Sequence, residues 1–367
     1  MRNDWKLLEE LCNTHAVCGR EDRLTRLIAD MIEPLADVVE IDRLGNVIGI
    51  LKGKQFPDHK LMLQAHMDES GLIVRNITPD GFILFERIGG PAEKSILAQR
   101  MQILTENGQI ITGYVGTKSV HTTSAEDKFR VPGTHELFID VGLPSAEAVE
   151  KSGIQIGDPI AYNPNFQRFG DGMICSKALD NRISIYLLIQ TLKHFANNRP
   201  ESTLVFAFTV LEEFSIRGSL PTVNRTQPDA IISLDITITS DTPIDDANLS
   251  PVRMGKGPSI KMMDYHGKGT MAGLVSSPPL RRFIERVAAE KDIPLQREVM
   301  RGLLTDPAFQ IYLGDKGYTA AGISIPHRYS HAPTSTVHES DVNLTADLLI
   351  ALSQQFNPSI DLRRGIL

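Results

Sequence analysis

The stretch LVFAFTVLEE, residues 204–213, has the pattern of an apolar β-strand that ends on two adjacent glutamates, Glu212 and Glu213. Long helical patterns alternate with further apolar strands after residue 177, up to the helical stretch ESDVNLTADLLIALSQQF at residues 339–356. This alternation is typical of parallel strands joined by helices. We therefore expect an α/β unit with the stretch 204–213 in its sheet.

Residues 71–165 have a different character. Short strand patterns such as GLIVRNI at 71–77 are broken by Gly and Pro, and a single helical pattern, SAEAVEKSG, occupies 145–153. Two amphipathic helices and a pair of strands, NVIGIL and KLMLQAHMD, precede this part. The simplest organisation is an α/β domain made of residues 1–70 and 166–367, interrupted by a β insertion at 71–165.

Composition excludes several classes of protein. Of the 367 residues, 41% are hydrophobic and 23% are charged, as in ordinary globular proteins. The formal net charge is −7 and no basic block is present, so nucleic acid is not an expected partner. No stretch approaches the roughly 20 apolar residues of a membrane span, and the N-terminus lacks the core of a signal peptide. Cys12, Cys18 and Cys175 fit no paired metal spacing, so we expect free thiols and a cytoplasmic location.

The ends of the predicted strands carry the candidate site residues. Ligands bind at the carboxyl ends of strands in open α/β sheets, and these ends are acidic or carry histidine. Asp180, at the start of a long helix, could on its own be a helix N-cap. The candidates that converge on this edge are His66, Asp68, Asp180, Glu212, Glu213, Asp235 and His331.

Clustered carboxylates repel one another unless cations neutralise them. Imidazole and carboxylate together suit zinc, with cobalt or manganese as alternatives, and a pair of metal ions is a common hydrolytic arrangement. Each ion would take one histidine, one terminal carboxylate and a share of a bridging carboxylate. One glutamate would then remain free to act as a general base and acid.

In order along the chain, the motifs AHMDE, KALDNR, EEFSIRG, SLDI and PHRYSHAP resemble those of the glutamyl and tetrahedral aminopeptidases. This is metallopeptidase family forty-two, in the clan of dinuclear zinc exopeptidases. The likeness covers nearly the whole chain, including LFIDVG and GDPIAY in the insertion and GKGPSIK at residues 255–261.

The resemblance implies His66 and Asp235 on one metal ion, Glu213 and His331 on the other, and Asp180 bridging them. Glu212 would be the general base and acid for a metal-activated water that cleaves the N-terminal residue from a peptide. Asp68 would orient His66, since residues i and i+2 of a strand share a face.

The resemblance also implies a fold and an assembly. The expected fold is a mixed sheet flanked by helices, with an inserted small β-barrel-like dimerisation domain. The expected partners are peptide substrates and further copies of the chain, as dimers assembled into a tetrahedral dodecamer.

Some positions depart from the family pattern or need separate weighing. Phe214 and Ser215 follow the two glutamates where relatives usually have Val-Gly, and GLLTDPAF at 302–309 lacks two expected glycines. Both changes border the expected substrate pocket. His327 lies four residues before His331, but it sits beside a proline at a strand end, and we do not expect it to bind metal. His121 matches a recurrent family position and is a weak candidate for an interface residue.

Two rival functions remain open at this point. Glu212 and Glu213 could superficially be the carboxylate pair of a glycosidase, because some relatives are labelled endoglucanases. Alternatively, the chain could be a non-catalytic assembly protein that keeps the fold without turnover. The retained ligands and base favour the aminopeptidase.

Overall fold

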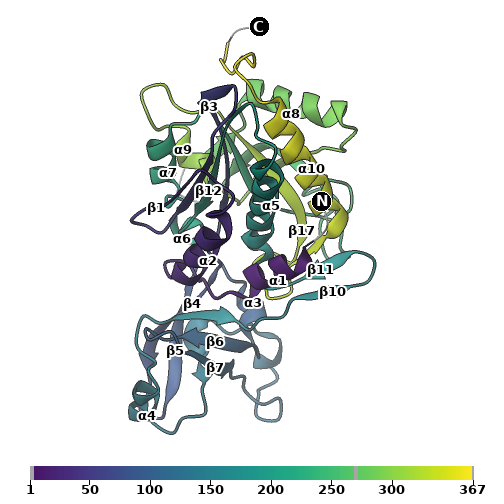
Figure 1. Ribbon diagram of the computed structural model, residues 1–367. Helices are drawn as coiled ribbons and strands as arrows, with labels where there is room; N and C mark the ends of the chain where they lie inside the picture. The colour runs from purple at the N-terminus through teal and green to yellow at the C-terminus, as the bar shows by residue number, and fades with distance from the viewer. Residues whose placement is uncertain (1–3, 268–271, 366–367) are drawn as a thin grey trace.

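A large mixed sheet and a closed β-barrel contain the strands of the computed structural model, which describes residues 4–267 and 272–365. Figure 1 shows the barrel at one end of the molecule, below the large sheet and its helices. The predicted α/β fold, with a mixed sheet flanked by helices, is confirmed.

The large sheet has the order β1-β2-β12-β3-β13-β17-β18-β11-β10, and β14 to β16 branch from β17. In chain order its strands are β1 (Val38–Ile41), β2 (Val47–Leu51), β3 (Phe56–His66), β10 (Gln167–Phe169), β11 (Met173–Cys175), β12 (Ser202–Thr209), β13 (Ala230–Ile238), β14 (Ser259–Tyr265), β15 (Gly273–Val275), β16 (Gln296–Arg301), β17 (Ala320–Arg328) and β18 (Thr336–His338). The four central strands β12, β3, β13 and β17 are parallel to their neighbours in this group. Their carboxyl ends therefore meet at one edge.

Helices cover both faces of this sheet. One face packs against α1 (Trp5–Asn13), α2 (Asp22–Ile32), α5 (Leu179–Ala196), α8 (Pro278–Glu290) and α10 (Glu339–Gln355), and the other against α7 (Leu220–Thr226) and α9 (Pro307–Gln310). Side chains alternate between the two cores along β3, as Met62 and Leu63 do, because successive residues of a strand point to opposite faces. None of the helices in the described part of the chain is long and apolar enough to cross a membrane. The cytoplasmic location stays a prediction.

The barrel has its own apolar core, which contains Leu72, Phe85 and Ile160. Its strands are β4 (Gly71–Ile77), β5 (Phe82–Ile88), β6 (Arg100–Leu104), β7 (Ile110–Val115), β8 (Ile139–Asp140) and β9 (Pro159–Tyr162), in the order β4-β5-β8-β7-β6-β9. The helices α3 (Glu93–Ile96) and α4 (Ala146–Lys151) and the 3-10 turns Asp127–Phe129 and Thr134–Glu136 complete this part. The predicted strand LFIDVG contributes only the two residues of β8.

The two strands expected as a pair, β2 and β3, are not neighbours. β12 lies between them, antiparallel to β2 and parallel to β3. Local patterns identify strands but contain no information about which distant strand pairs with them, so the expectation of a pair was wrong.

Candidate metal centre

The carboxyl ends of the central strands bring the predicted residues together on the side of the sheet that faces the barrel (Figure 1). His66 is the last residue of β3, and Asp235 lies within β13. Glu212 and Glu213 open the short helix α6 (Glu212–Ser215) just after β12. His331 follows β17, and Asp180 lies at the start of α5.

The six residues form two groups that could each hold a metal ion. Ligand atoms of His66, Glu212 and Asp235 lie within 4.8 Å of one another, and so do those of Asp180, Glu213 and His331. Asp180 connects the groups, since its Oδ1 lies 3.3 Å from His66 Nε2 and its Oδ2 lies 3.4 Å from His331 Nε2. Each oxygen of one carboxylate therefore faces a different histidine.

Burial and mutual repulsion make the carboxylates difficult to ionise without a counter-charge. Burial, together with the charge of Asp180, raises the pKa of Asp235 and that of Glu213 to about 7. Burial and the neighbouring carboxylates raise the pKa of Glu212 well above its usual value. Asp180 is the exception, because hydrogen bonds with His331 and His66 outweigh its burial and lower its pKa.

The histidines respond in the opposite sense. The carboxylate of Glu213 raises the pKa of His331 to about 10, against the effect of burial. Burial also opposes the shift at His66, but Glu212 and Asp180 raise its pKa well above the usual value. The carboxylates therefore favour positive charge on and between the two histidines.

This donor set fits two divalent cations. It combines imidazole nitrogens with carboxylate oxygens in two adjoining groups, and zinc, cobalt and manganese all accept that combination. A cation in each group would replace the protons that the raised pKa values otherwise retain on Asp235 and Glu213.

Asp68 has a different position from the one that strand geometry predicts. β3 ends at His66, so Asp68 lies beyond the strand. Its carboxylate Oδ1 is 3.5 Å from His66 Nδ1, while its backbone oxygen is closer, at 3.2 Å. The two carboxylate oxygens accept the backbone N–H groups of Glu212, at 3.1 Å, and Glu213, at 3.0 Å. Asp68 thus contacts both His66 and the segment that delivers the two glutamates.

A cavity of about 310 Å³ opens onto both groups. Phe214, Leu303, Leu304 and Phe309 form much of its apolar wall, which places the two departures from the family pattern beside the ligands. The cavity also contains Lys261, which is 1% exposed and has its ammonium 3.3 Å from Glu298 Oε1.

The barrel closes the other side of the centre. The carbonyl oxygen of Gly90 lies 2.7 Å from His331 Nδ1, which fixes the ring of this half-buried histidine. A Cβ atom at Gly90 would lie 2.8 Å from the same nitrogen, so only glycine allows this approach.

His327 and His121 lie outside both ligand groups. His327 is fully buried, and burial lowers its pKa to about 4. His121 is exposed on the loop after β7.

Sequence reasoning missed three side chains near the centre, namely Glu21, Asn46 and Lys261. Glu21 and Asn46 accept backbone N–H groups just before the two glutamates, from positions more than 160 residues away in the chain. The sequence contains no local signal for those contacts. Lys261 ends the quoted motif GKGPSIK, but its position in the cavity follows only from the pairing of β14 with β17.

Comparisons with known proteins identify the family. The model of the M42 glutamyl aminopeptidase family matches residues 45–348. A lysyl aminopeptidase from Pyrococcus furiosus is 32% identical over 357 residues, which is 97% of this chain and 98% of the relative.

Two solved structures are also similar. An aminopeptidase from the archaeon Desulfurococcus kamchatkensis shares 34% identity at a TM-score of 0.91, over 99% of this chain and 98% of its own. The TET1 peptidase of Pyrococcus horikoshii shares 26% identity at a TM-score of 0.84, over 96% of this chain and 99% of its own, and it is described as assembling into a tetrahedron or a large octahedral shell.

Proposed function

Since the chain belongs to the M42 glutamyl aminopeptidase family and is a metal-dependent aminopeptidase, we propose a role for each residue of the centre. His66 and Asp235 would hold one divalent cation, and Glu213 and His331 the other. Asp180 would be shared, because each of its oxygens already faces a different histidine. The donor set suits zinc, with cobalt or manganese as alternatives.

Glu212 would be the general base and acid. When bound, the two cations would lower the pKa of a water molecule and polarise the scissile carbonyl group. A carboxylate oxygen of Glu212 would accept the proton of the attacking water and then donate it to the departing amine. Its place in the wall of the cavity, beside His66 and Asp235, supports this role. So does its raised pKa, because burial favours the protonated form that would donate to the departing amine.

Asp68 would position both the base and a ligand. Its carboxylate holds the amides of Glu212 and Glu213, and its backbone oxygen lies beside His66 Nδ1. A hydrogen bond donated by Nδ1 would leave Nε2 unprotonated and able to bind a cation.

The separation of roles between the two adjacent glutamates gives a matched test. Glu212→Gln should retain two cations per chain while turnover of aminoacyl nitroanilides falls about 10²–10⁴-fold, the usual contribution of a general base. Glu213→Gln should instead weaken the binding of one cation. Near-normal turnover by Glu212→Gln would refute its assignment as the base.

The geometry does not favour the glycosidase. Glycosidase carboxyl pairs are at least about 5 Å apart to flank a sugar. Glu212 and Glu213, the pair that a glycosidase would need, instead belong to separate groups, and each has a carboxylate oxygen within 4.8 Å of an imidazole nitrogen, an arrangement that suits metal binding. Cellulose hydrolysis that persists after chelation would reverse this preference.

For the non-catalytic alternative, an apoprotein that takes up no zinc would be the supporting result. The complete set of ligands and the cavity beside them argue against it.

We also propose that residues 71–165 form a dimerisation domain and that the dimers assemble into a tetrahedral dodecamer. The barrel and its long loop expose large apolar side chains, including Tyr114, Val120 and the 93% exposed Phe129. The similar TET1 peptidase can assemble into a tetrahedron or a large octahedral shell. Light scattering should then detect a particle of twelve 40.6 kDa chains, and a monomer at micromolar concentration would contradict the assembly.

A further inference from the structure

The chain segment that delivers Glu212 and Glu213 has an unusual set of hydrogen bonds. Four consecutive backbone N–H groups, from residue 210 to residue 213, each donate to a side-chain oxygen instead of a backbone carbonyl. Val210 donates to Asn46 Oδ1 at 2.9 Å and Leu211 to Glu21 Oε1 at 3.2 Å. Glu212 and Glu213 donate to the two oxygens of Asp68.

The backbone needs this support because it leaves the sheet abruptly. β12 ends at Thr209, Leu211 has a φ of +61°, and α6 has only four residues. A residue with a Cβ rarely adopts a positive φ, and the first N–H groups of a helix have no partner within it. The segment would therefore have several buried, unsatisfied N–H groups without the three side chains.

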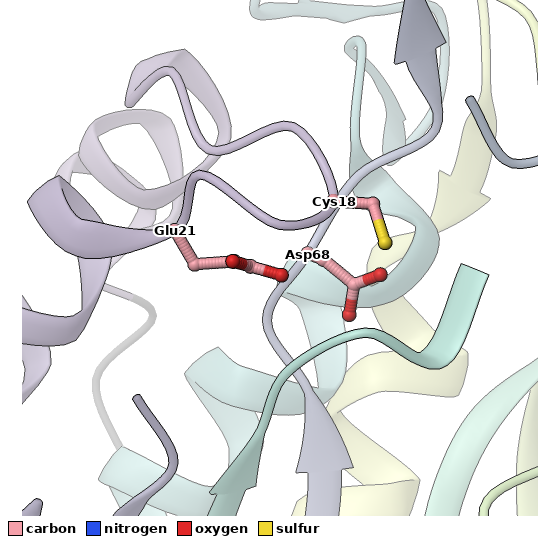
Figure 2. A group of neighbouring side chains, drawn as sticks. All are labelled: Cys18, Glu21 and Asp68. Atoms are coloured by element: carbon pink, nitrogen blue, oxygen red, sulfur yellow. The ribbon is translucent and has the colours of Figure 1, made fainter. Parts of the chain in front are cut away.

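Glu21 does not have the role that its place in the chain suggests. It occupies the N-cap position of α2, yet its side chain makes no capping hydrogen bond there. Its Oε1 instead accepts the N–H groups of Gly19 and, 190 residues away, Leu211. Figure 2 shows the side chain extending from the start of α2 towards the segment that carries Asp68.

The same group has the composition of a metal site, since ligand atoms of Cys18, Glu21 and Asp68 lie within 4.8 Å of one another (Figure 2). Its oxygens, however, already accept N–H groups. Both oxygens of Asp68 and Oε1 of Glu21 have backbone donors directed at them, and a cation there would lie against the positive ends of these dipoles. The hydrogen bonds favour a positioning role over a third cation.

We propose that Glu21 is a positioning residue that fixes the backbone at Leu211 and thereby the direction of the Glu212 side chain. Its role depends on an oxygen placed close enough to accept the Leu211 N–H group and not on its charge. With Asn46 and Asp68 it accounts for the acceptors of all four N–H groups. The inference rests on the proposed role of Glu212 as the general base.

Two conservative variants separate the effect of side-chain length from the effect of charge. Glu21→Gln keeps an oxygen at the same distance and removes the charge, so its kcat should stay within about threefold of the wild-type value. Glu21→Asp keeps the charge but is one methylene shorter, so its kcat should fall about 10- to 100-fold, as misplacement of a catalytic group by about 1 Å does. KM and the number of bound cations should be unchanged in both.

Asp341→Asn provides a matched control for stability. Asp341 is fully buried and accepts the N–H groups of Gly255 at 2.6 Å and Gly257 at 2.7 Å, but it does not line the cavity. Its variant should lose thermal stability without loss of kcat. Hydrogen exchange of the peptide covering 208–216 should accelerate in Glu21→Asp and remain unchanged in Asp341→Asn.

Three results would overturn the proposal. They are a Glu21→Gln enzyme that is less active than Glu21→Asp, two variants that both have normal kcat, and the loss of a bound zinc equivalent in either variant. The exchange measurement does not depend on activity. It therefore tests the position of the amides even if Glu212→Gln shows that Glu212 is not the base.

Discussion

Two neighbouring clusters of buried charge differ in whether the protein itself neutralises them. Glu69 is 2% exposed, and both of its oxygens accept hydrogen bonds from Lys177 Nζ, at 2.8 and 2.7 Å, with Arg182 Nη2 at 3.6 Å. Lys177 and Arg182 lower the pKa of Glu69 despite its burial. The candidate metal centre lies next to Asp68, the adjacent residue, and contains four carboxylates around two histidines.

The difference separates a structural cluster from a functional one. A buried carboxylate that is paired with basic side chains stays ionised. It stabilises the fold only while those side chains are present. Carboxylates that outnumber their cationic neighbours have raised pKa values, as Asp235 and Glu213 do, and can exchange protons for metal ions. The contrast can be tested by substitutions in each of the two clusters.

The largest effect is expected at the centre. Asp235→Ala should reduce kcat/KM at least about 10³-fold, or about 4 kcal/mol of transition-state stabilisation, because one cation loses a carboxylate that no neighbour replaces. It should weaken one cation site more than the other, since its partners would be His66 and the shared Asp180. Metal analysis of the dialysed variant provides the measurement.

Asp241→Ala is the matched control for that change. Asp241 lies six residues further along and forms an ion pair with Arg328 at 2.8 Å, outside both ligand groups. Its variant should keep turnover within about threefold of wild type. Equal losses in the two variants would mean that Asp235 has no special role.

Substitutions in the cluster of Glu69, Lys177 and Arg182 should affect stability instead of turnover. Lys177→Met would leave Glu69 buried with the N–H group of Ala16 and the more distant Arg182 as partners, and we expect a loss of about 3–5 kcal/mol in the free energy of unfolding. Adding Glu69→Gln to that variant should restore part of the loss, because it removes the charge that lost its partner. Urea unfolding of both variants measures this, and a loss below about 1 kcal/mol for Lys177→Met would contradict it.

A smaller effect should appear in the pH dependence of the chelated protein. Asp235 and Glu213 have folded-state pKa values raised to about 7, so between pH 4.5 and 7 the folded state binds more protons than the unfolded state. Stability therefore falls as pH rises through this window, by roughly 3 kcal/mol for each of the two groups. His331, with its pKa raised to about 10, acts in the same direction between pH 6.5 and 10.

The check is the melting temperature at pH 5.5 and pH 8.5, with and without zinc. The chelated protein should melt at a lower temperature at pH 8.5. The difference in melting temperature between the zinc-loaded and the chelated protein should increase as pH rises, because the ligands must lose protons to bind metal. A difference that decreases as pH rises would show that the carboxylates are already ionised without metal.

The sequence was sufficient to predict which residues gather at the candidate metal centre, because strand ends are local features. Apolar runs end at His66, Asp235 and the two glutamates, and parallel strands place such ends at one edge. The α/β fold with a mixed sheet followed from the same patterns and from the family motifs.

What supports the centre could not be predicted in the same way. β12 enters between β2 and β3 through pairings more than 140 residues apart in the chain, and Glu21 reaches Leu211 across 190 residues. Asp68 was expected to share a strand face with His66, but the strand ends before it. Such contacts depend on lateral packing, which hydrophobic periodicity does not encode.

The central claim is that the uncompensated carboxylates hold two cations through a shared Asp180. Calorimetric titration of the chelated protein with zinc, beside Asp180→Ala, tests it most directly. The wild-type chain should bind two equivalents, and Asp180→Ala should lose affinity for both. Fewer than two equivalents in the wild type, or two unchanged sites in Asp180→Ala, would contradict the claim.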